Sequence, residues 1–187
     1  MPFDPLRFTA FCAYLMAWLF FALGAALSWI PRLQRQAGEP SRIKPAVAAG
    51  TLLQVAAVCA ITFRLDSGPL HPKPWELIAV TALAISGSAL FAWALRSAPA
   101  HDAPNQLVTH GAYAKLRHPT YLAFLAMLVA TGLLASAGLR LLVAAGMYLA
   151  GSEIRIAAEE EDLARTFRTE FERYCLRTRW RYFPGLR

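Results

Sequence analysis

The segment from Phe8 to Ile30, FTAFCAYLMAWLFFALGAALSWI, decides the fold class, because it holds no charged side chain over a length that spans a membrane. About 20 mostly apolar residues in a helix are enough to cross the hydrocarbon core of a bilayer. Further apolar segments run over about 45–63, 75–95, 119–135 and 139–151. The sequence therefore predicts an all-α integral membrane protein with about five transmembrane helices.

The last two apolar segments are short, and only the turn-like stretch 136–138 separates them. This spacing predicts a C-terminal helical hairpin whose second helix continues into a polar tail. We expect the first helix to end at Pro31, since proline disrupts a helix interior. We also expect a single domain over 1–187, with three spans in 1–96 and the polar loop, the hairpin and the C-terminal helix in 97–187.

The distribution of basic residues predicts the orientation in the membrane. The net charge is +7, and 16 of the 19 basic residues are arginine. They flank the apolar segments, so we expect them to face anionic lipid headgroups and not nucleic acid. The first and third connections and the tail carry most of them, which places the N-terminus outside and the tail in the cytoplasm. The Ala and Arg richness favours a prokaryotic inner membrane, and an endoplasmic reticulum location stays open.

Residues 105–121 collect polar side chains beside an apolar segment, where such groups are costly unless they are paired or hydrated. They include the phenol of Tyr113, the cation of Arg117 and the imidazole of His118. Pro119 favours a helix start, whose free amides attract anions. A basic interfacial loop with aromatic anchors has the same composition, so the residues alone leave both interpretations open.

A second polar segment, 155–174, follows the hairpin and has apolar residues at helical spacing. If this segment is helical, Arg155 and Glu159 lie four residues apart on one face. Their pairing is also consistent with a plain surface salt bridge worth about 0.3–0.5 kcal/mol. The three cysteines match no metal or redox spacing, so we predict no metal site.

Together the two segments resemble the isoprenylcysteine carboxyl methyltransferase and phospholipid methyltransferase family of integral membrane enzymes. The shared pattern Leu-Val-Thr-x-Gly-x-Tyr-x-x-x-Arg-His-Pro-x-Tyr runs from Leu107 to Tyr121. A second pattern, Arg-x-x-x-Glu-Glu-x-x-Leu-x-x-x-Phe, runs from Arg155 to Phe167. The resemblance covers about the last 85 residues, and the family's usual glycine after that phenylalanine is Arg168 here.

The resemblance implies methyl transfer from S-adenosylmethionine to a lipophilic acceptor that comes from the bilayer. It carries over ten cofactor contacts: Asn105, Gln106, Leu107, Val108, Tyr113, His118, Pro119, Thr120, Tyr121 and Glu159. It also implies that Arg155 faces the acceptor.

We expect Arg155, Arg117 and Glu160 to form the catalytic set. A carboxylate acceptor is already ionised and can be oriented by a bidentate contact with an arginine. An amine acceptor needs a base instead, and Glu160 would serve. We expect a carboxylate acceptor similar to an isoprenylcysteine, with a phospholipid amine as the alternative. A non-catalytic membrane protein that retains the fold stays open, and the sequence predicts no oligomeric state.

Overall fold

The computed structural model describes residues 4–36, 44–63, 72–97 and 106–183, with the backbone alone over 25–36. This part of the chain is all-helical, as predicted. Its elements are α1 (Pro5–Gln36), α2 (Pro45–Thr62), α3 (Pro74–Ser97), the 3-10 helix η1 (Gly111–Ala114), α4 (Pro119–Leu134), α5 (Leu139–Phe167) and α6 (Thr169–Arg177).

Local sequence signals set several of the helix ends. The carboxylate of Asp4 accepts hydrogen bonds from the amides of Leu6 at 3.1 Å and Arg7 at 3.2 Å, which caps the start of α1. Proline occupies the first turn of both α2 and α4, where its missing amide costs no hydrogen bond. The prediction that the first helix ends at Pro31 is wrong, because α1 continues to Gln36. An interior proline removes one amide donor, and the rest of the helix ladder carries the chain past it.

The predicted hairpin is confirmed in α4 and α5. Ser136 and Gly138 take positive φ values of 50° and 52°, which reverse the chain within a few residues. Beyond this turn α5 is one continuous helix of 29 residues. Its first part is apolar, and its second part carries the polar motif.

Four stretches of the described residues are long and apolar enough to cross a membrane: Pro5–Gly24 within α1, α2, α3, and Leu139–Arg177, which joins α5 and α6. Helix α4 has only 16 residues. At 1.5 Å per residue it measures roughly 24 Å, which is shorter than the roughly 30 Å hydrocarbon core. The predicted number of about five therefore includes one helix below the length of an independent span.

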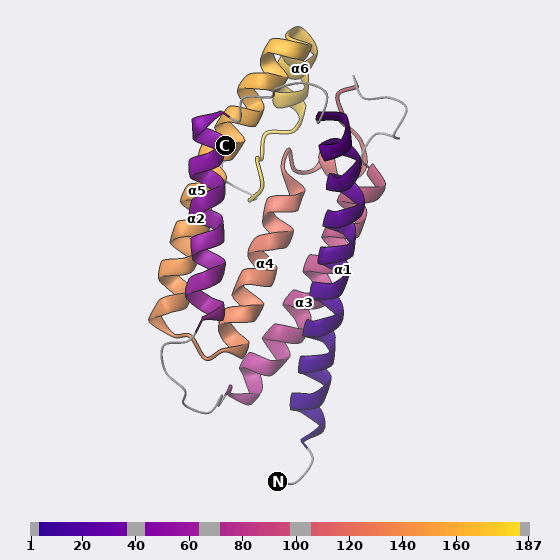
Figure 1. The fold of residues 1–187 in the computed structure, drawn as a ribbon. Helices are drawn as coiled ribbons and strands as arrows, with labels where there is room; N and C mark the ends of the chain where they lie inside the picture. Colours follow the sequence, from indigo (N-terminus) through magenta and orange to yellow (C-terminus); the bar gives the residue numbers. More distant parts are fainter. Residues whose placement is uncertain (1–3, 37–43, 64–71, 98–105, 184–187) are drawn as a thin grey trace.

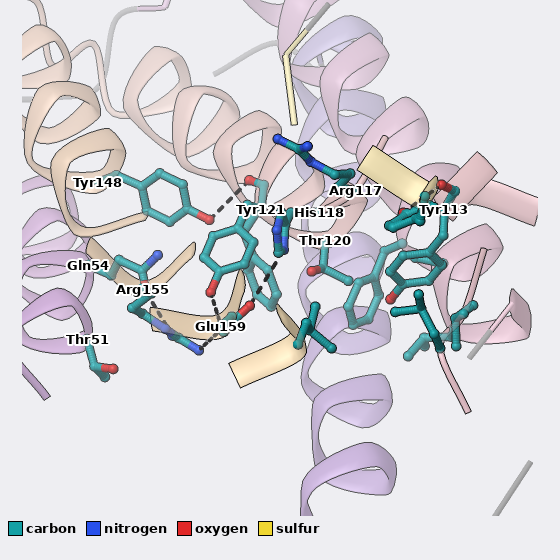
Figure 2. A pocket seen from close by; sticks show the side chains of 18 of the residues that line it. Thr51, Gln54, Tyr113, Arg117, His118, Thr120, Tyr121, Tyr148, Arg155 and Glu159 are labelled. Atoms are coloured by element: carbon teal, nitrogen blue, oxygen red, sulfur yellow. Dashed lines mark hydrogen bonds and ion pairs between the residues drawn. The ribbon is translucent and has the colours of Figure 1, made fainter. Parts of the chain in front are cut away.

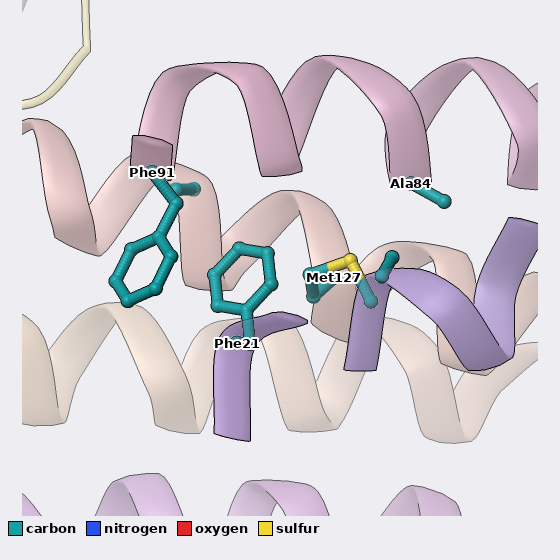
Figure 3. Packing of buried hydrophobic residues seen from close by; sticks show 6 residues of the cluster. Phe21, Ala84, Phe91 and Met127 are labelled. Atoms are coloured by element: carbon teal, nitrogen blue, oxygen red, sulfur yellow. The ribbon is translucent and has the colours of Figure 1, made fainter. Parts of the chain in front are cut away.

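Helix α4 lies between two pairs of helices, α2 with α5 on one side and α1 with α3 on the other (Figure 1). Figure 3 shows the packing that holds α1, α3 and α4 together. The rings of Phe21 and Phe91 stack with centroids 4.3 Å apart, and Phe124 meets both rings edge-on. Met127 is fully buried beside them.

Helices α2 and α5 approach each other closely at two glycines. A Cβ atom placed on Gly50 would lie 2.6 Å from the carbonyl oxygen of Gly151 and 2.6 Å from Cγ of Arg155. Real side chains do not come so close to backbone, so glycine permits this contact between the helices. The contact brings one face of α2 against the polar part of α5.

Candidate active site

A cavity of about 590 Å³ lies at the end of the bundle that carries the polar segments. Ten of its lining residues were predicted from the sequence: Gln106, Leu107, Val108, Tyr113, Arg117, His118, Thr120, Tyr121, Arg155 and Glu159. Ten others were not: Thr51, Gln54, Val55, Phe91, Ala94, Leu95, Phe124, Tyr148, Leu163 and Tyr174. The cavity therefore joins the two motifs to side chains of α2 and α3.

The loop between α3 and α4 is held against the end of α3. Gly111 has a φ of +60°, and a Cβ atom there would lie 2.0 Å from the hydroxyl oxygen of Ser97. That hydroxyl accepts a hydrogen bond from the amide of Ala112 at 3.2 Å and donates to the carbonyl of Trp93 at 2.7 Å. On the other side, the hydroxyl of Tyr174 donates to the carbonyl of Tyr113 at 2.8 Å. The loop is thus fixed by α3 and by α6.

Glu159 stands at the centre of the polar wall (Figure 2). It accepts a hydrogen bond from the hydroxyl of Tyr121. Nδ1 of His118 lies 3.6 Å from one of its oxygens, and a guanidinium nitrogen of Arg155 lies 3.5 Å from the other. The predicted pairing of Arg155 with Glu159 is therefore present, and it belongs to a larger cluster that faces the cavity.

Arg155 is held from more than one side. Its Nη1 donates to the amide oxygen of Gln54 at 2.9 Å, and its guanidinium carbon lies 5.5 Å from the centre of the Tyr121 ring. Its buried Nε has no hydrogen-bond partner among the described residues. A cation so held retains a donor for a further anionic group.

Glu160 points away from this cavity and is not among the residues that line it. Its carboxylate lies 3.0 Å from Nε of Arg117, 3.2 Å from Nε2 of His118 and 3.0 Å from Nη2 of Arg181. Only 14% of the side chain is exposed, so these three contacts surround it. His118 consequently lies between two carboxylates, Glu159 on the cavity side and Glu160 behind.

The C-terminal segment 178–183 forms a strap behind the motif. The amides of Arg117 and His118 donate to the carbonyls of Trp180 at 3.0 Å and Arg181 at 2.7 Å. The hydroxyl of Tyr182 donates to Glu153 at 2.8 Å. Burial, with that hydrogen bond second, raises the pKa of Tyr182 to about 12, so the phenol stays a neutral donor at physiological pH.

Two predicted cofactor contacts, Pro119 and Asn105, remain to be considered. Pro119 is fully buried at the first turn of α4 and does not line the cavity. Asn105 lies outside the described residues. The α2 contribution was missed, although one signal for it exists: Gln54 is an uncharged polar residue within an apolar segment, where polar groups are commonly functional.

The fold and the site define an integral membrane protein of the helical-bundle class, with a cavity at one end of the bundle that polar and apolar side chains line together. Residues 76–165, which are 90 of the 187, match the model of the isoprenylcysteine carboxyl methyltransferase (ICMT) family. The match confirms the resemblance seen in the two motifs. No curated protein and no solved structure matches the chain.

Proposed function

We propose that the protein transfers a methyl group from S-adenosylmethionine to a carboxylate on a lipophilic acceptor. The observation that carries this proposal is the composition of the cavity. Family motif residues and a held arginine make one wall, and the apolar side chains Val55, Phe91, Leu95 and Phe124 make another. Methyltransferase activity is what the match to the family model implies, and the cofactor and acceptor are our proposal.

The cavity fits the cofactor. Its volume lies within the range of about 300–1,000 Å³ that small-molecule sites usually have. Glu159 and Tyr121 are placed to hold an ammonium or ribose hydroxyls, while the amides at the start of α4 suit a carboxylate and His118 supports Glu159 from behind. Gln106, Leu107, Val108, Tyr113 and Thr120 complete this wall. S-adenosylmethionine, when bound, supplies an electrophilic methyl group.

Two features of the site support a carboxylate acceptor over an amine. It arrives ionised, so the chain need only orient it, and Arg155 lines the cavity with N–H donors on Nη1 and Nη2 beyond those that Gln54 and Glu159 engage. Methyl transfer is an in-line displacement in which alignment is the main requirement. An amine acceptor needs a base, and Glu159, the one carboxylate among the described lining residues, is already engaged with Tyr121, His118 and Arg155.

This geometry gives little support to Glu160 as a base. Its oxygens face Arg117, His118 and Arg181 and not the cavity. We therefore assign Glu160 and Arg117 to holding His118 and the strap, with Arg155 as the residue that meets the acceptor. A phospholipid amine remains the alternative acceptor and is an outcome of the test.

The experiment is a labelled-methyl transfer assay with the purified protein in detergent or lipid discs. Panels of prenylcysteines, fatty acids and phosphatidylethanolamine separate the acceptors. We expect label in a base-labile ester of a carboxylate. Label on a phospholipid amine would replace the acceptor, and no binding of S-adenosylmethionine or its demethylated product by calorimetry would refute an enzymatic role.

We further propose that the protein lies in a prokaryotic inner membrane, where it takes its acceptor from the surrounding lipids, with the cavity at the cytoplasmic side. The charge distribution along the chain supports this orientation. Labelling of single cysteines introduced at each terminus in intact cells tests it, and a reagent that cannot cross the membrane should reach only the N-terminus.

A further inference from the structure

Gln54 is a polar residue of α2, within a candidate span and outside the region that matches the family. Both ends of its amide are engaged. Its oxygen accepts from Nη1 of Arg155 at 2.9 Å, and its nitrogen donates to the hydroxyl of Ser152 at 3.0 Å. Polar groups in a span are costly unless they are paired, so an amide committed in this way is held in place by its partners.

The direction of these hydrogen bonds is determined by Ser152. That hydroxyl donates its single proton to the carbonyl of Tyr148 at 2.8 Å, so it can only accept from Gln54. The amide nitrogen must therefore face Ser152, and the amide oxygen must face Arg155. Ser152 is fully buried, which protects this arrangement from water.

The same contacts continue to Tyr121 and Glu159, which belong to the wall of motif residues that we propose holds the cofactor. The hydroxyl of Tyr148 donates to the carbonyl of Tyr121 at 3.1 Å, and the hydroxyl of Tyr121 donates to Glu159. Glu159 pairs with Arg155, whose guanidinium also lies over the Tyr121 ring. Together with the contacts of Ser152 to Gln54 and Tyr148, these contacts close a ring that runs from Arg155 through α2 and back to Arg155. Figure 2 shows the part of this ring from Tyr148 through Tyr121, Glu159 and Arg155 to Gln54.

Within this ring the Arg155 guanidinium is held at two edges. Gln54 holds Nη1, and Glu159 lies beside Nη2. Glu159 is shared, since it also contacts Tyr121 and His118, whereas Gln54 hydrogen-bonds only Arg155 and Ser152 among the described residues. A substitution of Gln54 therefore changes the hold on the Arg155 guanidinium without removing a contact of Tyr121 or His118, which a substitution of Glu159 would do.

We propose that Gln54 is a positioning residue for the acceptor carboxylate: it holds the Arg155 guanidinium in the orientation that meets the carboxylate and aligns it with the cofactor wall. The proposal rests on the proposed function and deepens it. Gln54 acts through Arg155, because both ends of its own amide are occupied.

A double-mutant cycle tests this role. Binding of a farnesylated cysteine is measured in the presence of the demethylated cofactor product for four proteins: the unsubstituted chain, Gln54→Leu, Arg155→Ala and the double variant. A hydrogen bond to a charged group contributes enough that Gln54→Leu should weaken binding about tenfold when Arg155 is present. It should weaken binding less than about twofold when Arg155 is absent.

The controls separate positioning from folding. Val58→Leu lies one helical turn along α2 on a partly exposed face and should leave binding unchanged. Affinity for the demethylated cofactor product and the unfolding temperature should be the same for Gln54→Leu and Val58→Leu. Gln54→Asn keeps a polar group in the span but shortens its reach, so it should lose acceptor affinity as Gln54→Leu does.

Equal tenfold losses in both Arg155 backgrounds, or acceptor affinity retained in Gln54→Leu or Gln54→Asn, would overturn the proposal. If Gln54→Leu does not fold, Gln54→Asn carries the same cycle. Failure of the proposed function has a different signature. The unsubstituted protein itself would then bind neither the cofactor product nor the farnesylated cysteine.

Discussion

The glycine contact between α2 and α5 makes a quantitative prediction for Gly50→Ala. The new Cβ atom would lie 2.6 Å from the carbonyl oxygen of Gly151, and ordinary van der Waals contact begins at 3.4 Å. The shortfall is about 0.8 Å, and the neighbour on this side is backbone, which yields only if a whole helix moves. We therefore expect α2 to shift away from α5 by about that amount.

Such a shift reaches the site directly. The hydrogen bond from Arg155 to Gln54 measures 2.9 Å, so a separation of about 0.8 Å more would take it beyond hydrogen-bond distance. Overpacking of this kind costs about 1–3 kcal/mol of stability. The alanine also gains about 0.5–1 kcal/mol from its better helix propensity, which offsets part of the loss.

Gly146→Ala is the matched control for this gain. Gly146 lies on α5, and a Cβ atom there would meet nothing within 4 Å. Both variants receive the same helix propensity, so the difference between their unfolding free energies isolates the overpacking at Gly50. The assay is unfolding in detergent together with the Michaelis constant for a prenylcysteine. Equal stability and equal Michaelis constants for the two variants would refute the close contact and its link to Arg155.

Three further predictions concern the cofactor wall and its supports. Glu159→Ala should abolish the binding of S-adenosylmethionine measured by calorimetry. Glu161→Ala, which removes an exposed ion pair, should leave this binding unchanged. Equal affinities in the two variants would contradict the role of Glu159. Arg181→Ala should lower the unfolding free energy by about 2 kcal/mol, because it removes charged contacts with Glu153 and Glu160 that hold the strap, and an unchanged denaturation midpoint would count against that strap. Gly111→Ala should weaken cofactor binding more than Gly138→Ala does. Both positions have positive φ, but only at Gly111 would a Cβ atom clash with Ser97. Equal affinities of the two variants would mean that the loop position does not depend on this contact.

Much of the fold follows from apolar length alone. Uncharged runs of about 20 residues predict helices whether or not their partners are known, and the turn around Gly138 predicts the hairpin. The predicted end of α1 at Pro31 is wrong, because a single interior proline does not stop the helix, which continues to Gln36. Which helices pair cannot be obtained in this way, because nearly every residue of these segments is apolar and no face stands out.

The candidate site also has a part that the sequence predicts, the motif residues, and a part that it does not, their partners elsewhere in the chain. Most motif residues predicted to lie near a cofactor, such as His118, Tyr121 and Glu159, do line one cavity. They come together because the two motifs occupy the start of α4 and the polar half of α5. The ion cluster around Glu160 could not be predicted, since its partner Arg181 lies in the tail and is brought to the motif by the backbone pairing of Trp180 with Arg117 and of Arg181 with His118.

The origin of the missed wall carries a consequence for specificity. Thr51, Gln54 and Val55 belong to α2, which lies before residues 76–165. The matched region supplies the loop, Glu159 and Arg155. Among the described residues, the proposed cofactor contacts and the arginine that meets the acceptor therefore come from that region. The surface beside Arg155 comes instead from α2, an apolar helix whose Gly50 permits the close approach to α5. Changes on α2 can therefore reshape the side of the cavity beside Arg155 while the motif residues that we propose as cofactor contacts are kept, and we expect acceptor selectivity to follow α2.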